Sequence, residues 1–186
     1  MNDFQLYFKL GLQHILSWSS SDHILFLFVL IVIFGIRQWR KLLLLVSLFT
    51  LAHTSSLLLS VYGVLQVNEN LIEHLILWTI LITALSNVII VEKKILSRIH
   101  YYFSFFFGLI HGLGFAADFK MLIAGQHHKL LPLLEFALGI ETAQILLGII
   151  ILLVGVLFTG LFKVKEREYE LFVSALIAGF VTALLL

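Results

Sequence analysis

Six long apolar segments, each ending at charged or polar residues, are the feature that most constrains this chain. They cover residues 21–36, 42–64, 71–91, 101–117, 132–162 and 169–186. A helix needs about 20 residues to cross about 30 Å of hydrocarbon, and most of the segments approach that length. The first is short, and the fifth is long enough for a tilted helix. The sequence therefore predicts an all-α integral membrane protein, a six-helix transmembrane bundle that forms one domain over residues 1–186.

Composition supports a membrane protein and excludes several other classes. Hydrophobic residues make up 61% and charged residues 12% of the chain, against about 45–50% and about 25% in soluble domains. The 12 basic and 11 acidic residues nearly balance, so no strong field attracts nucleic acid, and we expect none as a partner. The chain has no Cys, which excludes disulfides, thiolate nucleophiles and thiolate metal ligands. We expect the lipid bilayer as a partner. The sequence does not indicate whether the protein is a monomer or an oligomer.

The basic residues predict an orientation, because nine of the twelve lie in the loops after the first, third and fifth segments. These nine are Arg37, Arg40, Lys41, Lys93, Lys94, Arg98, Lys163, Lys165 and Arg167. The positive-inside rule places them in the cytoplasm, with both termini outside an inner (plasma) membrane. Apolar residues recur at helical spacing within residues 1–20, which predicts a short amphipathic helix in the outer interface. We expect no cleaved signal peptide, since the N-terminus lacks a basic region before an apolar run.

Ionisable residues inside the apolar segments require a partner or a role, because a charge at the bilayer centre costs at least about 2.5–3.5 kcal/mol. A rise of about 1.5 Å per residue places most of them between the membrane centre and the outer face. We predict that a single polar site is formed by Asp22, His23, His53, His111 and Glu141. Gln144, on the same helix face as Glu141, and Glu73 are secondary candidates.

His111 lies within the stretch F-G-L-I-H-G-L-G-F-A, between Gly108 and Gly112. Glycines four residues apart predict close helix packing, which would direct His111 into the bundle interior. A single membrane histidine is commonly just an interhelical hydrogen-bond partner, worth about 0.6 kcal/mol. Two carboxylates and three imidazoles at overlapping depths favour a shared site instead. His100 is expected at the cytoplasmic interface, and the loop pair His127 and His128 is expected to be solvated.

Imidazole and carboxylate without thiolate suit divalent Ni, Zn, Co, Fe or Mn. The same groups would serve as a proton relay. A third possibility is a zinc site with an open position for water, which requires about three protein ligands. A fourth is that the polar groups only specify how the helices pack.

Four stretches give the chain a resemblance to the HupE/UreJ family, along nearly its whole length. H-I-L-S-W-S-S-S-D-H-I-L-F-L-F (14–28) is similar to the first-helix signature, and S-L-F-T-L-A-H-T-S-S-L-L-L (47–59) resembles the second-span Phe-Thr-x-Ala-His pattern. F-G-L-I-H-G-L-G-F-A is the most specific match, and F-A-L-G-I-E-T-A-Q (136–144) resembles the fifth-span element. Two positions depart from the family: Trp18-Ser-Ser-Ser replaces a glycine before Asp-His, and Ala137 stands where Asn is frequent. The altered spacing makes His14 a secondary candidate.

The resemblance implies a membrane protein of six to eight spans, regarded as a nickel permease or an accessory protein of hydrogenase and urease systems. We therefore expect transport of a divalent transition-metal ion, most simply nickel, as the function, with zinc as another ion that the site would bind. The alternative is an intramembrane zinc hydrolase in which three histidines hold the metal and Asp22 or Glu141 activates water. No G-x-x-x-x-G-K-[ST] sequence is present, so transport would be ion-coupled or passive.

Overall fold

Helices form nearly the whole fold, which a computed structural model describes for residues 3–17, 20–126 and 128–186, and no strand occurs in these residues. The α-helices are α1 (Asp3–Leu16), α2 (Ser21–Ile31), α3 (Trp39–Val61), α4 (Glu69–Ile89), α5 (Lys93–Gly114), α6 (Ala116–Leu122), α7 (Leu130–Val156) and α8 (Glu166–Leu185). A 3-10 turn, η2 (Ile36–Gln38), precedes α3, and a π-helical segment, η3 (Leu157–Leu161), follows α7. The predicted all-α fold is confirmed.

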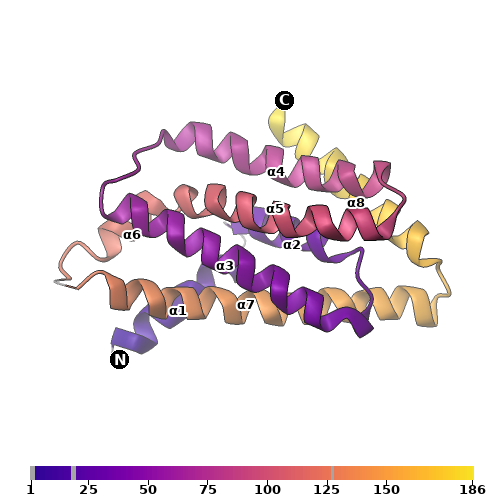
Figure 1. The fold of residues 1–186 in the computed structure, drawn as a ribbon, viewed down its shortest axis with the longest axis horizontal. Coiled ribbons are helices and arrows are strands. Elements are labelled where there is room, and N and C mark those ends of the chain that lie inside the picture. The colour runs from indigo at the N-terminus through magenta and orange to yellow at the C-terminus, as the bar shows by residue number, and fades with distance from the viewer. Residues whose placement is uncertain (1–2, 18–19, 127) are drawn as a thin grey trace.

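The long helices lie side by side, so that their loops gather at two ends of an elongated bundle (Figure 1). The loops α2–α3, α4–α5 and α7–α8 meet at one end, which we call the basic end because it carries the nine basic residues named above. The loops α3–α4 and α6–α7 lie at the other end, which we call the cleft end. The spacing of basic residues along the chain thus corresponds to one end of the molecule.

Within the described residues, four helical stretches are each long and apolar enough to cross a membrane: Ile36–Val61, Glu69–Ile89, Leu130–Leu161 and Glu166–Leu185. They correspond to the second, third, fifth and sixth predicted segments. Two bent pairs of helices pass the same test only when each pair is taken together, α1 with α2 at 69° and α5 with α6 at 54°. The predicted total of six spans is reached only if each bent pair counts as one crossing.

The predicted first span over residues 21–36 is not one continuous helix. Helix α2 has 11 residues, or about 16 Å of length, and is too short to cross a bilayer alone. After Ile31 the chain leaves the α-helix before η2 begins at Ile36. Helix α2 therefore ends inside the bundle, and its last carbonyl groups need partners from neighbouring helices.

Helix α1 is the predicted N-terminal amphipathic helix, and its apolar side packs against α7. The two helices cross at Gly11 and Gly139. A Cβ atom on Gly11 would lie 2.2 Å from the Phe136 carbonyl oxygen, and one on Gly139 would lie 2.2 Å from the Phe8 carbonyl oxygen. Only glycine at both positions allows this crossing, which fixes α1 and brings its last turn over the bundle interior.

Helices α3 and α5 pack closely through the glycines of the F-G-L-I-H-G-L-G-F-A stretch. A Cβ atom on Gly108 would lie 2.8 Å from the Phe49 carbonyl oxygen, and one on Gly112 would lie 2.2 Å from the His53 carbonyl oxygen. The predicted close-packing motif is confirmed, and His111 is 1% exposed. The contact brings His53 and His111 to the same level of the bundle.

Candidate metal centre

Four histidines from four helices converge near the cleft end. His14 lies in the last turn of α1, His23 near the start of α2, His53 on α3 and His111 on α5. One ligand atom each from His14, His23 and His53 lies within 4.8 Å of the others. The ring centroid of His111 is 5.1 Å from that of His23. The structure thus brings together three of the predicted primary residues, His23, His53 and His111, and adds His14.

Five ring nitrogens in this cluster lack hydrogen-bond partners although they are buried. They are Nε2 of His14, His23 and His111, and both Nδ1 and Nε2 of His53. A buried polar atom without a partner costs about 1–3 kcal/mol. The phenylalanine side chains around the cluster cannot accept or donate conventional hydrogen bonds, so these nitrogens are available to a bound cation or to water.

Asp22 supplies the carboxylate closest to the cluster in sequence and in space. Its Oδ1 lies 3.3 Å from Nδ1 of His23, and the carboxylate is partly exposed. Because Asp22 engages Nδ1 of His23, the orphaned Nε2 of the same ring is the one left for a ligand. A carboxylate that orients an imidazole in this way is common around metal sites.

A cleft of about 1240 Å³ opens beside the histidines. His14, Asp22, His23 and His111 line it, whereas His53 is fully buried behind them. Two further carboxylates, of Glu73 and Asp118, also line the cleft, and no Lys or Arg of the described residues does. An acidic cleft without basic residues concentrates cations.

Aromatic rings close the cluster on the side away from the cleft. Phe26 follows His23 by one turn of α2, and its ring centroid is 5.1 Å from that of His111. Phe49 precedes His53 by one turn of α3, with centroids 5.9 Å apart. Both phenylalanine side chains are at most 1% exposed. The histidines therefore face an open cleft on one side and an apolar wall toward the basic end.

Glu141 does not lie among the histidines, so the prediction that it shares their site is wrong. Its Oε1 accepts a hydrogen bond of 2.6 Å from Ser47 Oγ. Ser47 is six residues before His53, or about 9 Å along α3 toward the basic end. The depth estimate for Glu141 gave its height on α7 but not the direction of its side chain, and the crossing of α7 with α3 turns it toward Ser47.

Gln144 lies beside Glu141 at the same crossing and is fully buried. Its Oε1 accepts a hydrogen bond of 3.0 Å from Thr50 Oγ1, while its Nε2 has no partner. Thr50 precedes His53 by one turn of α3. The polar side of α3 therefore continues from the histidines toward the basic end, but through amide and hydroxyl groups rather than strong metal ligands.

Glu73, a secondary candidate, and His128, which was expected to be solvated, both lie at the surface. Glu73 is exposed and lines the cleft, as an entrance residue would. His128 is exposed in the α6–α7 loop, and His127 lies outside the described residues. Neither Glu73 nor His128 belongs to the group of three histidines that could hold an ion.

Sequence reasoning ranked His14 too low and misplaced His100. His14 follows the buried residues Tyr7 and Gly11 at a spacing of four and three, which puts it on the packed side of α1. His100 is fully buried, not interfacial. The buried face of α5 continues from His100 at spacings of four, four and three, through Ser104, Gly108 and His111. This periodicity is the signal that would have placed His100 in the interior.

The cluster has the chemistry of a transition-metal site. Imidazole nitrogens bind Ni, Zn, Co and Cu in preference to Mg or Ca, which prefer oxygen ligands. Tetrahedral zinc with bonds of about 2.0–2.1 Å needs ligand atoms about 3.4 Å apart. One ligand atom from each of three histidines lies within 4.8 Å of the others, a wider spacing at most than the metal needs, which side-chain rotation would narrow.

Comparison with known families gives one result that covers the chain. A family model described as HupE / UreJ protein matches residues 1–185. The match includes the helices that carry all four histidines. Searches of curated proteins and of solved structures gave no match.

Proposed function

The chain belongs to the HupE/UreJ family, and from that premise we propose that it moves a divalent transition-metal ion, nickel in the first place, across the inner (plasma) membrane. The ion is the transported substrate. The binding residues are His14, His23, His53 and His111, with Asp22 as the orienting carboxylate. Glu73 and Asp118 form the entrance. By the positive-inside rule, the cleft end faces outward and both termini lie outside.

The observation that carries this proposal is the set of five unpartnered ring nitrogens at the base of an acidic cleft. A scaffold that used histidines only for packing would pair these nitrogens with carbonyl or hydroxyl groups. Here the four rings come from four different helices, and one ligand atom each from His14, His23 and His53 lies within 4.8 Å of the others. A divalent ion would satisfy several of them at once.

Release to the other side requires a change of shape, because Phe26 and Phe49 close the cluster toward the basic end. Helix α2 is the natural moving part, since it is short, ends inside the bundle and carries Asp22, His23 and Phe26. A shift of α2 would withdraw one ligand and one wall residue together. Alternating access of this kind needs no nucleotide.

Metal uptake into sealed vesicles tests the proposal. Purified protein reconstituted with an entrapped metal-sensitive dye should admit Ni²⁺, and His53→Ala should lower both uptake and binding affinity, the affinity by at least about 100-fold, because it removes a ligand. His128→Ala is the matched control, an exposed histidine changed in the same way, and should behave as wild type. Equal uptake by wild type and His53→Ala would overturn the proposal.

The size of the cleft favours one second candidate, an intramembrane zinc hydrolase. A volume of about 1240 Å³ is larger than an ion requires and would admit an organic substrate. Three histidines would hold zinc and Asp22 would activate water. A resident zinc would survive dialysis against a chelator, whereas a transported ion would be lost, so metal analysis after dialysis separates the two candidates.

A further inference from the structure

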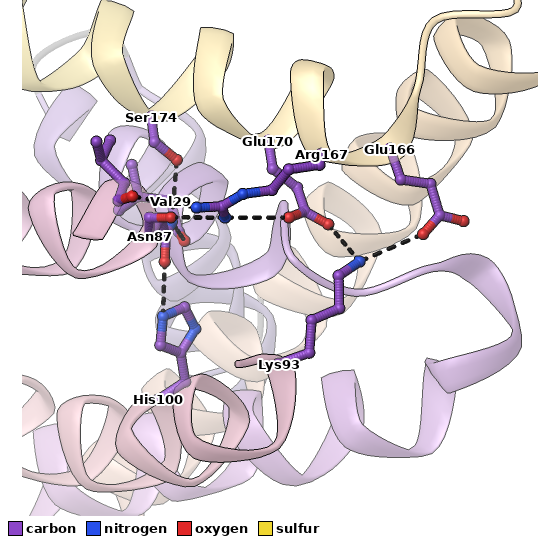
Figure 2. Close-up of polar contacts among 9 residues, drawn as sticks. Val29, Asn87, Lys93, His100, Glu166, Arg167, Glu170 and Ser174 are labelled. Atoms are coloured by element: carbon purple, nitrogen blue, oxygen red, sulfur yellow. Dashed lines mark hydrogen bonds and ion pairs between the residues drawn. The ribbon is translucent and has the colours of Figure 1, made fainter. Parts of the chain in front are cut away.

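A second buried polar network lies toward the basic end and contains His100, which the metal centre does not use. Figure 2 shows His100 of α5 below Asn87 of α4, with Ser174, Arg167 and Glu170 of α8 beside them. His100, Asn87 and Ser174 are each fully buried. The network joins α4, α5 and α8 around the end of α2.

The network completes the hydrogen bonding of the α2 C-terminus. The carbonyl oxygens of Phe28 and Ile31 accept from backbone N–H groups of Val32 and Phe34. The two carbonyl oxygens between them, of Val29 and Leu30, face the side chains of Asn87 and His100 instead. Two residues from neighbouring helices thus hold the end of α2.

The orientation of the Asn87 amide is fixed by its contacts. Its Nδ2 donates to the Val29 carbonyl oxygen at 2.7 Å and to Ser174 Oγ at 3.1 Å. Turning the amide over would place Oδ1 against the Val29 carbonyl, so that two acceptors would face each other. Oδ1 therefore points at His100, at 2.9 Å from its Nε2 (Figure 2).

Both ring nitrogens of His100 consequently face oxygens that only accept. Nε2 faces Asn87 Oδ1, and Nδ1 lies 2.9 Å from the Leu30 carbonyl oxygen. A neutral imidazole has one N–H and can satisfy only one of these acceptors, whereas an imidazolium has two and satisfies both. The site has the hydrogen-bonding pattern of a doubly protonated histidine.

The surrounding charges do not supply a counter-ion to the ring. Among the described residues no carboxylate contacts His100, and Glu170 pairs with Lys93 and Arg167. Glu166 also pairs with Lys93, and Lys41 lies over the Phe34 ring. Helix α2 presents no titratable group here, and α4 presents the neutral amide of Asn87. Burial opposes a second proton, while the two acceptors and the negative end of the α2 dipole favour it.

We propose that His100 is a proton-binding site, in which the second proton holds the C-terminal end of α2 to α4 and α5. When that proton leaves, an imidazole lone pair faces one carbonyl oxygen and one of the two contacts is lost. Helix α2 carries His23 and Asp22 at its other end, so the proton and the metal ion act on opposite ends of the same short helix. This coupling role rests on the proposed transport function, whereas proton binding itself does not.

Nitrogen NMR of the metal-free protein tests proton binding directly. Protein labelled with ¹⁵N-histidine gives ring-nitrogen signals that distinguish one proton from two, and His100→Gln assigns the signal that disappears. We expect more than half of His100 to be doubly protonated at pH 6.5, despite complete burial. A smaller fraction would overturn the proposal.

Two variants test whether the acceptors are the cause. Asn87→Leu removes the acceptor at Nε2 and should lower the midpoint of the His100 titration by at least about one pH unit, a tenfold loss of proton affinity. Ser174→Ala is the matched control, because it removes a hydrogen bond from the same amide but leaves both acceptors, and should shift the midpoint by less than half as much. Equal shifts in the two variants would overturn the proposal.

Coupling to transport is tested separately in vesicles. His100→Gln leaves every metal ligand in place and should still bind Ni²⁺, but its uptake should no longer respond to an imposed pH gradient. If wild type takes up no metal, the transport function fails while the NMR result still stands. If His100→Gln responds to the gradient as wild type does, the coupling role is wrong.

Discussion

At the scale of single residues, the account depends on the protonation of four histidines that share one small volume. A metal ion binds only the neutral imidazole, so protons and metal compete for each ring. Asp22 lies 3.3 Å from Nδ1 of His23 and leaves Nε2 of that ring for the ion. The remaining rings lie close enough that a charge on one repels a charge on the next.

The protein should therefore bind metal more weakly as the pH is lowered. Every ring that takes up a proton in the metal-free protein must lose it before it coordinates, so acid weakens binding. Ni²⁺ affinity, as measured by equilibrium titration, should therefore be weaker at pH 5.0 than at pH 7.5. His128→Ala should show the same profile. Equal affinity at the two pH values would show that no histidine of this kind binds the metal.

At the scale of helices, two glycine crossings place the histidines. Gly112 lets α5 approach α3 next to His53, and Gly11 with Gly139 lets α1 approach α7 one turn before His14. Each crossing brings backbone against backbone, with no room for a Cβ atom. The position of the site is thus determined by residues that are not themselves ligands.

Gly139→Val should weaken metal binding without touching a ligand. The new Cβ would lie 2.2 Å from the Phe8 carbonyl oxygen, so α1 must move away and take His14 with it. We expect at least about a tenfold loss of affinity with helix content retained by circular dichroism. Gly179→Val on α8, where no atom lies within 4 Å of the new Cβ, should leave affinity unchanged. Similar losses in both variants would mean that α1 does not position the site.

The sequence was sufficient for some of these features and not for others. Apolar length predicted the membrane fold, and the Gly108 and Gly112 spacing predicted the crossing that buries His111. The break in the first segment was missed because residues 32–35 are as apolar as the helix before them, so hydropathy does not mark its end. Glu141 was misplaced because height along a helix can be counted from the sequence, whereas the direction of a side chain depends on how α7 crosses α3.

At the scale of the whole molecule, charge and chemistry are separated along the bundle. Nine basic residues lie at the basic end, and the cleft at the other end is lined by Asp22, Glu73 and Asp118. This polarity is the basis for assigning an outer entrance and a cytoplasmic exit. The same separation puts the His100 network between the metal centre and the basic end.

Cysteine labelling in intact cells tests this orientation, and the chain has no native Cys to interfere. A cysteine at Gln126, in the α6–α7 loop, should react with an impermeant maleimide added outside. A cysteine at Gln38, beside α3 at the basic end, should react only after the cells are opened. The reverse pattern would place the cleft in the cytoplasm and make the protein an exporter or an intracellular acceptor.

The most direct test of the central claim is X-ray absorption spectroscopy of the purified protein loaded with one equivalent of Ni²⁺. We expect a Ni²⁺ coordination shell that contains at least three imidazole nitrogens, and the loss of one of them in His53→Ala. A shell dominated by oxygen, or an identical spectrum in His53→Ala, would contradict the claim that the histidines of α1, α2, α3 and α5 hold the ion.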